Sequence, residues 1–322
     1  MYLLISHQLR VIAVLFATVC LTFVTATHAE DLITARSYWE DASANATFED
    51  AKLQQYVAYE GILAKGYSDS AYWIRLRIEP QTSQHPSDRL ILRLRPAFID
   101  RIALYDSADL TRIEPLETGD MTQWADADYH SLNHGFQIQV TPEARDVYLR
   151  ITSTSTLMVH AQALTPIDAS RMDHAQELVY AVSTGLIVMF LAWVFVSWLN
   201  DRDHVNRAFV IKQAASILYT VGYFGYFRVF LSDEMSPSAI NMLFNVVLIT
   251  ATGSAFWYET HFLRDYNPPK WLLRMLRSFY LVSVLAMVLL ILGYTRQALQ
   301  LNMATIGVGS AMLLLAVLVF IH

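Results

Sequence analysis

Side chains that could bind a small polar molecule are concentrated between residues 73 and 134. Arginine side chains form paired hydrogen bonds with carboxylates and hydroxyls, and aromatic rings offer flat faces on which a sugar can stack. The candidate ligand-binding residues are Trp73, Arg75, Arg93, Tyr105, Trp124, Tyr129 and His134, and His130 and Arg95 have the same chemical character. These residue types predict a site for a glycan or another small polar ligand. The alternative is structural: Trp73 and Tyr105 would cover the outer face of a sheet or pack beneath a loop.

The segment from Asp120 to His134 is predicted to be a long polar loop that carries aromatic side chains. Long loops are more often functional than short ones, so this loop is the preferred edge of the predicted binding site. Its Asp126, Asp128 and His130, together with His134, raise the question of a metal. Their spacing fits neither a closed zinc site nor a calcium loop, so no metal site is predicted.

The polar half of the chain contains none of the common catalytic motifs. It has no Gly-x-Ser-x-Gly, no His-Glu-x-x-His, no cysteine and no phosphate-binding glycine loop. We therefore predict no catalytic residue and no cofactor. The net charge is −6 without a basic stripe in this half, so nucleic acid is not an expected partner.

The elements that must position these side chains are predicted to be short strands. Residues 72–78 and 89–95 alternate between apolar and polar side chains, as strands with one buried face do. Further strands are expected at 98–105, 135–140, 147–152 and 157–164. Many short strands separated by turns predict an all-β jelly roll or β-sandwich over residues 30–167.

The second half of the chain is predicted to lie in a membrane. Hydrophobic residues make up 54% of the chain and charged residues 16%, whereas a soluble domain carries about 25% charged residues. After a short linker, 168–177, five apolar stretches have spanning length, at 178–199, 208–231, 240–262, 272–292 and 299–321. The sequence therefore predicts an all-α transmembrane bundle over 178–322.

The distribution of positive charge predicts the orientation of this bundle. Lys and Arg near the predicted cytoplasmic ends are Arg202, Arg207, Lys212, Arg264, Lys270, Arg274 and Arg277, against only Arg228 and Arg296 near the external ends. Positive charge is enriched on the cytoplasmic side of membrane proteins. The predicted location is thus the inner membrane of a bacterium, with a periplasmic N-terminal domain.

Residues 1–29 have the pattern of a secretory signal peptide. Arg10 precedes an apolar run, and small residues surround a possible cleavage point before Glu30. An uncleaved anchor helix is the alternative, and both would carry the following domain across the membrane. The only cysteine, Cys20, lies in this segment, so no disulfide is expected in the exported domain.

The order of these parts resembles the bacterial seven-transmembrane receptors with diverse intracellular signalling modules (7TMR-DISM), in the version with a type-2 extracellular domain. The motifs that carry the resemblance are Ser37-Tyr38-Trp39-Glu40-Asp41, Thr47-Phe48-Glu49-Asp50, Tyr72-Trp73-Ile74-Arg75-Leu76, Leu90-Ile91-Leu92-Arg93-Leu94, Ile99-Asp100-Arg101-Ile102-Ala103-Leu104-Tyr105, Val147-Tyr148-Leu149-Arg150-Ile151, Leu218-Tyr219 with Gly222 and Gly225, and Thr260-His261-Phe262-Leu263-Arg264 with Pro268-Pro269 and Leu272. The resemblance implies a jelly-roll domain similar to carbohydrate-binding modules, seven spans and a cytoplasmic output such as a diguanylate cyclase, a histidine kinase or a phosphatase. This chain shows five predicted spans and no output domain, so we expect it to be truncated after the fifth span.

The sequence thus predicts a signal-transduction receptor that senses a periplasmic ligand and relays it through the bilayer-embedded helices. Its partners would be a small-molecule or glycan ligand, the lipid bilayer, and a second copy of the chain or a partner kinase or cyclase. The main alternative is a complete membrane-anchored binding or scaffold protein that regulates a separate kinase or cyclase. A transporter is disfavoured, because the sequence shows no polar mid-membrane site or broken helix.

Overall fold

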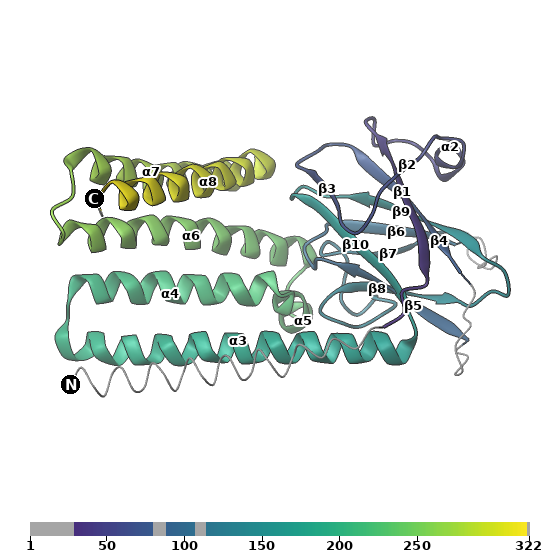
Figure 1. The fold of residues 1–322 in the computed structure, drawn as a ribbon, viewed down its shortest axis with the longest axis horizontal. Coiled ribbons are helices and arrows are strands. Elements are labelled where there is room, and N and C mark those ends of the chain that lie inside the picture. Colours follow the sequence, from purple (N-terminus) through teal and green to yellow (C-terminus); the bar gives the residue numbers. More distant parts are fainter. Residues whose placement is uncertain (1–28, 80–87, 107–113, 321–322) are drawn as a thin grey trace.

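The computed structural model describes residues 29–79, 88–106 and 114–320. The predicted signal peptide lies outside the described residues except for Ala29. The described chain forms two parts placed end to end, a β-domain and a set of helices that run away from it (Figure 1). The prediction of an all-β domain followed by an all-α bundle is confirmed.

The β-domain consists of two antiparallel sheets. The six-stranded sheet has the order β2-β1-β4-β9-β6-β7 and the four-stranded sheet the order β3-β10-β5-β8. The strands are β1 (Ile33–Asp41), β2 (Val57–Ala58), β3 (Leu63–Gly66), β4 (Ala71–Ile78), β5 (Arg89–Arg95), β6 (Arg101–Asp106), β7 (Leu116–Thr118), β8 (His134–Gln139), β9 (Arg145–Thr152) and β10 (Leu157–Leu164). A short helix, α2 (Phe48–Lys52), lies at the end of the domain far from the other helices (Figure 1).

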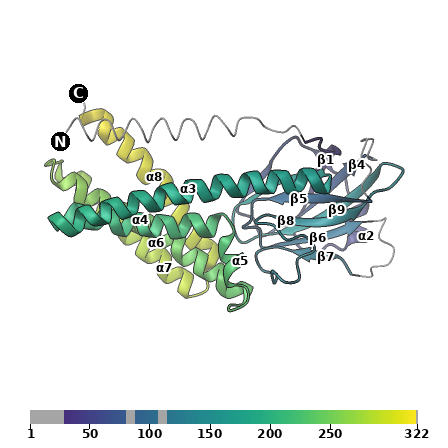
Figure 2. The same ribbon diagram turned by 90° about the horizontal axis from the view of Figure 1, so that it is seen from below.

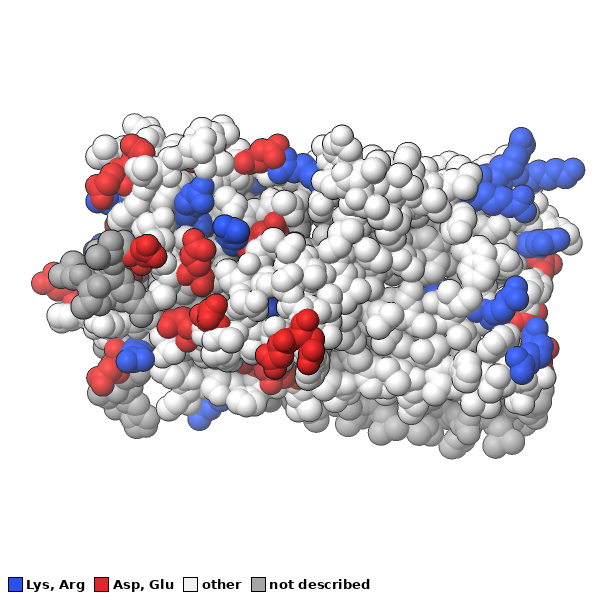
Figure 3. All heavy atoms as spheres, turned by 180° about the vertical axis from the view of Figure 1, so that it is seen from behind, with Lys and Arg blue, Asp and Glu red and all other residues white. Residues whose placement is uncertain are grey.

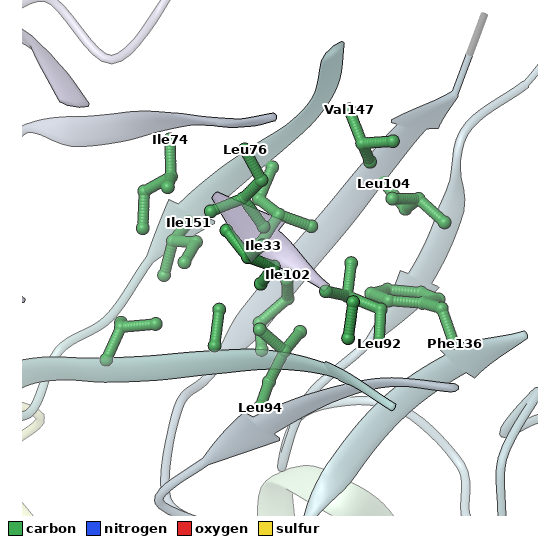
Figure 4. Close-up of a cluster of buried hydrophobic side chains, with 14 of the residues drawn as sticks. Ile33, Ile74, Leu76, Leu92, Leu94, Ile102, Leu104, Phe136, Val147 and Ile151 are labelled. Carbon is green, nitrogen blue, oxygen red and sulfur yellow. The ribbon is translucent and has the colours of Figure 1, made fainter. Parts of the chain in front are cut away.

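Alternating side chains from both sheets form one apolar core between them. Ile74 and Leu76 of β4 pack in the same cluster as Leu92 and Leu94 of β5 and Phe136 of β8 (Figure 4). All five are fully buried, and burial of each side chain contributes about 1.5–3 kcal/mol. The period-two pattern of these strands therefore sets which face of each sheet turns inward.

Strand β5 is buried on its second face as well. Ile91 of β5 and Leu164 of β10 form a smaller cluster with Ala169 of α3 (Pro166–Asp201). The start of α3 thus covers the outer face of the four-stranded sheet (Figure 2). This cover explains how Arg93, on that outer face, comes to be buried.

Six further helices or helical segments make up the second part. They are α3 (Pro166–Asp201), α4 (His204–Tyr223), α5 (Tyr226–Leu231), α6 (Pro237–Arg264), α7 (Lys270–Ile291) and α8 (Thr295–Phe320). Among the described residues, four helices are long and apolar enough to cross a membrane: α3, α6, α7 and the stretch Thr295–Leu315 of α8. Helix α4 packs against α3 and α6 and lies between them (Figure 1).

Two boundaries differ from the sequence prediction. Residues 168–177 are not a linker but the first turns of α3, because Thr165 caps the helix and Pro166 occupies its first turn. The predicted span 208–231 is divided into α4 and α5, because Gly225 adopts a φ of 88° between them. The turn leaves α5 beside the β-domain instead of continuing α4 (Figure 1).

Charged side chains divide the surface into bands along the helices. On the face shown in Figure 3, the middle of the helical part carries almost no charge, and Lys and Arg gather at the end far from the β-domain. That end holds the α3–α4 and α6–α7 turns, with Arg202, Arg264 and Lys270. The pattern is the one expected for a lipid-facing belt with a basic cytoplasmic edge.

Candidate coupling site between the β-domain and the helices

The four-stranded sheet and the loop from Asp120 to Asn133 contact the helices at the end of the bundle nearest the β-domain. The start of α3 contacts β5, and α5 lies close to the loop that precedes β8 (Figures 1 and 2). Three arginines take part in polar contacts across this boundary: Arg93 of β5, Arg228 of α5 and Arg296 of α8.

Arg93 joins the sheet to α3 through a buried ion pair. Its Nε donates to Oδ1 of Asp173 at 2.6 Å, and its Nη2 donates to Oε1 of Gln176 at 2.5 Å. The side chains of Arg93 and Asp173 are only 1% and 7% exposed. A buried pair of this kind is costly to break, because either partner alone is left as an uncompensated charge.

The loop before β8 adds two donors to the same carboxylate. The Tyr129 hydroxyl donates to Oδ2 of Asp173 at 2.8 Å, and Nδ2 of Asn133 donates to Oδ1 at 3.4 Å. Burial raises the pKa of Tyr129, and the negative charge of Asp173 raises it further, so the phenol stays a donor at neutral pH. Asp173 therefore ties α3 to both β5 and the loop.

Local sequence explains why these groups meet. In β5, Arg93 lies between the core residues Leu92 and Leu94, so its side chain leaves the opposite face of the sheet. Helix α3 begins two residues after Leu164, the last residue of β10, at a cap formed by the Thr165 hydroxyl and Asp168 N–H. Helix α3 therefore begins along the outer face of the sheet, and Asp173 lies beside Arg93.

Arg228 joins α5 to the other side of the loop. Its Nη1 donates to Nδ1 of His134 at 2.7 Å and to the Gly119 carbonyl at 3.2 Å. Its Nη2 donates to the carbonyls of Ser131 and Asn133, both at 3.3 Å. The guanidinium also lies 4.8 Å from the ring centre of Trp124, within cation–π range.

His134 is held neutral at the centre of this contact. Its Nδ1 accepts from Arg228, and its Nε2 lies 2.9 Å from the Ala97 carbonyl, to which it donates. Burial lowers the pKa of His134 well below the usual value, and the charge of Arg228 lowers it further. The neutral ring therefore links the loop between β5 and β6 to α5.

Asp120 lies near the same guanidinium, and its buried Oδ1 accepts no hydrogen bond from any described residue. Burial raises the pKa of Asp120 to about 8, and Asp100 adds to the effect while Arg228 opposes it. Asp120 is therefore largely protonated at neutral pH in the folded protein. Its neighbour Gly119 has no room for a side chain, because a Cβ there would lie 2.1 Å from the Asp100 carbonyl oxygen.

The third contact joins α8 to the loop between β3 and β4. Arg296, in the first turn of α8, donates from Nη2 to the Ser68 carbonyl at 3.0 Å and forms an ion pair with Asp69. Asp69 is 86% exposed, so this pair contributes much less to stability than a buried one. It places the last described helix against the edge of the β-domain.

A pocket of about 220 Å³ lies between these contacts. Its lining from the β-domain includes Arg95, Met158 and His160, and its lining from the helices includes Tyr180 and Phe224. Both parts of the chain therefore contribute to one cavity.

Four of the seven predicted ligand-binding residues meet at this boundary. Arg93, Trp124, Tyr129 and His134 all take part in the contacts with α3 or α5. The predicted binding loop is thus the part of the β-domain that rests on the helices. No local pattern reveals the partners Asp173 and Arg228, because Asp173 lies 80 residues from Arg93 and 44 from Tyr129, and Arg228 lies 94 residues from His134.

The other three lie on the outer face of the six-stranded sheet, beside α2. The Trp73 ring is fully buried, 6.2 Å from the ring of Phe48 and 5.3 Å from the ring of Tyr105. The guanidinium of Arg75 lies 4.9 Å from the ring of Tyr56. These contacts match the structural alternative for Trp73 and Tyr105, and a ligand-binding role for any of the seven residues stays a prediction. Within the described ranges, no cluster of His, Cys, Asp and Glu could hold a metal ion.

Comparison with known families identifies the β-domain. Residues 34–165 match the family model 7TMR-DISM extracellular 2. The β-domain is therefore similar to the type-2 extracellular domain of the 7TMR-DISM receptors. No curated protein matches the chain.

A β-domain similar to this extracellular domain, followed by helices long enough to cross a membrane, fits a transmembrane receptor. The protein is a multi-pass membrane protein with an N-terminal extracellular sensor domain. The family domain is a sensor and not a catalytic domain. The match ends at residue 165, at the residue that caps α3, so the three arginine contacts lie at the boundary between sensor and helices.

Proposed function

We propose that this chain is the sensing and relay part of a signal-transduction receptor in the bacterial inner membrane. The sensor domain binds a glycan or another small polar molecule in the periplasm. The helices pass the resulting movement to a cytoplasmic output of the diguanylate cyclase or histidine kinase type that lies outside this sequence. Two copies of the chain, or one copy and a partner kinase or cyclase, form the signalling unit.

The observation that carries this proposal is the rigid junction between β10 and α3. Only Thr165 separates the strand from the helix, and the buried Arg93–Asp173 pair fixes the helix to the neighbouring strand. A rotation of the sheet must therefore turn or tilt α3 with it. A flexible linker would absorb the same rotation.

The energy available for the relay is limited by the ligand. A ligand shifts a two-state equilibrium only by the difference in its affinity for the two states, and coupling energies between sites are commonly about 1–3 kcal/mol. An exposed contact such as Arg296–Asp69 can break and re-form within that range. The buried contacts of Arg93 and Arg228 would be retained in both states.

The test uses the whole chain in phosphatidylcholine nanodiscs, with Cys20 replaced by serine and spin labels at Asp201 and Lys270. These exposed positions lie at the ends of α3 and α7 away from the sensor domain. A panel of sugars and small polar solutes is first screened for those that raise the melting temperature. We expect at least one stabilising ligand to change the distance between the two labels.

Two other outcomes contradict parts of the proposal. A ligand that binds without moving the labels would make the protein a membrane-anchored binding or scaffold protein. A panel without any stabilising ligand would contradict small-molecule sensing and favour a protein partner as the stimulus.

A further inference from the structure

The pocket between the sensor domain and the helices has a polar wall and an apolar wall. Arg95, Asn133, His160 and Gln176 supply its polar lining. Ile62, Met158, Tyr180, Tyr223 and Phe224 supply the apolar lining. At about 220 Å³, the pocket is slightly smaller than the 300–1,000 Å³ or so of a typical drug-sized site, so its occupant must be small.

Arg95 gives this pocket a positive charge. Within the described part of the chain Arg95 forms no ion pair, whereas Arg93 is paired with Asp173. Its Nη2 donates to Nδ1 of His160 at 3.0 Å and approaches Oε1 of Gln162 at 3.5 Å, both neutral partners. Its Nε is buried and has no hydrogen-bond partner in the part of the chain that the structure describes.

The surroundings of Arg95 favour the binding of an anion. Burial lowers the pKa of Arg95 and the nearby charge of Arg93 lowers it further, while Tyr180 and Asp173 oppose the effect. Burial lowers the pKa of His160, and the charges of Arg95, Arg36 and Arg93 lower it further, so its ring stays neutral and keeps accepting from Arg95. A second guanidinium nitrogen, Nη1 of Arg93, is also buried and has no hydrogen-bond partner among the described residues. A desolvated positive charge is stabilised when an anion reaches it with hydrogen bonds.

The apolar wall restricts what can carry that anion. The rings of Tyr180 and Phe224 are stacked, with centroids 3.7 Å apart and planes 2° from parallel. Met158 faces the same space and can adapt its shape to a guest. A neutral sugar could stack here but would leave Arg95 without a counter-charge. A bare inorganic anion would satisfy Arg95 and leave the apolar wall unfilled.

We propose that this pocket binds a small monocarboxylate with a compact apolar body, with its carboxylate on Arg95 and its body against Tyr180 and Phe224. This assignment rests on the proposed sensing function and names the ligand class and the site. Because Arg95 and His160 belong to the sensor domain and Tyr180 and Phe224 to the helices, the ligand bridges the two parts. It would therefore stabilise the arrangement in which they are close together.

The test measures the binding of benzoate by calorimetry to the whole chain in phosphatidylcholine nanodiscs, with benzamide as its neutral analogue. Hexanoate and hexanamide form a second pair without a ring. We expect each acid to bind more tightly than its amide. Arg95→Gln should weaken acid binding by about 10–100-fold, since a hydrogen-bonded charge is lost. Arg101→Gln, at an exposed arginine of β6, should leave it unchanged.

A second variant provides a control for the case in which Arg95→Gln misfolds. Met158→Trp fills the pocket without changing its charge, and we expect it to abolish acid binding while the melting temperature stays near that of the wild type. Equal binding of acid and amide, or undiminished binding in both variants, would overturn the proposal. Loss of benzoate binding in discs that contain phosphatidylglycerol would also overturn it, because the pocket would then belong to a lipid headgroup.

The distance between the labels at Asp201 and Lys270 separates this proposal from the proposed function. Benzoate binding that depends on Arg95 but moves no helix supports the pocket and contradicts the relay. Helix movement caused by another ligand, without any benzoate binding, supports the relay and contradicts the pocket.

Discussion

Replacement of Asp173 by alanine tests the junction between sensor and helices most sharply. The change leaves the Arg93 guanidinium, which is 1% exposed, with Gln176 as its remaining side-chain acceptor. The Tyr129 hydroxyl and the Asn133 amide lose the same acceptor. Removal of one partner from a buried ion pair typically costs about 3–5 kcal/mol, so we expect a loss of that size in the free energy of unfolding.

The assay is a urea titration of the protein in nanodiscs, followed by tryptophan fluorescence. The matched control is Asp146→Ala, which breaks the pair with Arg77 whose side chains are 44% and 33% exposed. That exposed pair is expected to contribute less than about 1 kcal/mol. The double variant Arg93→Met/Asp173→Leu replaces the ion pair by apolar groups and should recover most of the lost stability.

The results that would refute this reasoning are specific. If Asp173→Ala costs no more than Asp146→Ala, the Arg93–Asp173 pair is hydrated and does not hold α3 against the sheet. If the double variant is as unstable as Asp173→Ala, the loss comes from packing of α3 and not from an orphaned charge.

Three further predictions concern other parts of the molecule. Burial raises the pKa of Asp120 from its usual 3.8 to about 8, so its stabilising protonation is complete below about pH 4 and lost as the pH rises through 8. Asp120→Asn should therefore gain about 2–3 kcal/mol of unfolding free energy over the wild type between pH 6 and 9, and a constant difference across this range would contradict the burial of Asp120. Gly225→Ala should lower the melting temperature, because a Cβ would lie 2.7 Å from the Leu132 carbonyl oxygen and φ is 88°; an unchanged melting temperature would show that α5 is not docked on the loop. Trp73→Ala should cost about 3–5 kcal/mol in a urea titration followed by circular dichroism, because its side chain is fully buried; a loss of ligand binding at wild-type stability would instead make Trp73 a ligand-binding residue.

The strands could be predicted from the sequence because their pattern is local. Residues 72–78 and 89–95 alternate over seven positions, and the structure has β4 and β5 at these places. Four strands were not predicted: β1, β2, β3 and β7. The last three have only two to four residues, which carry no measurable period, and the nine residues of β1 do not alternate strictly between buried and exposed positions. The alternation also could not show that β5 is covered on both faces, because the cover comes from a helix that begins at Pro166.

The candidate site could be predicted only in part, for a physical reason. The loop before β8 stands out by its length and its aromatic residues, but its partners are chosen by tertiary packing. His134 meets Arg228 at a separation of 94 residues, and Arg93 meets Asp173 at a separation of 80. The sequence places Arg228 at an external flank and cannot show that α5 turns back to the sensor domain. Arg93 and His134 therefore looked like ligand-binding residues, although their hydrogen bonds are made with the helices.

The most direct test of the central claim, that the sensor domain is docked rigidly on the helices, is one distance distribution. Spin labels are placed at the exposed Gln54, beside α2 at the far end of the sensor domain, and at Lys270, at the far end of α7. Electron–electron resonance of the nanodisc protein, with Cys20 replaced by serine, then gives the spread of their separation. The buried contacts of Arg93 and Arg228 predict a single narrow distribution, which broadens in Asp173→Ala. A broad distribution in the wild type would contradict the account, because the two parts would then be joined loosely and could not relay a signal through α3.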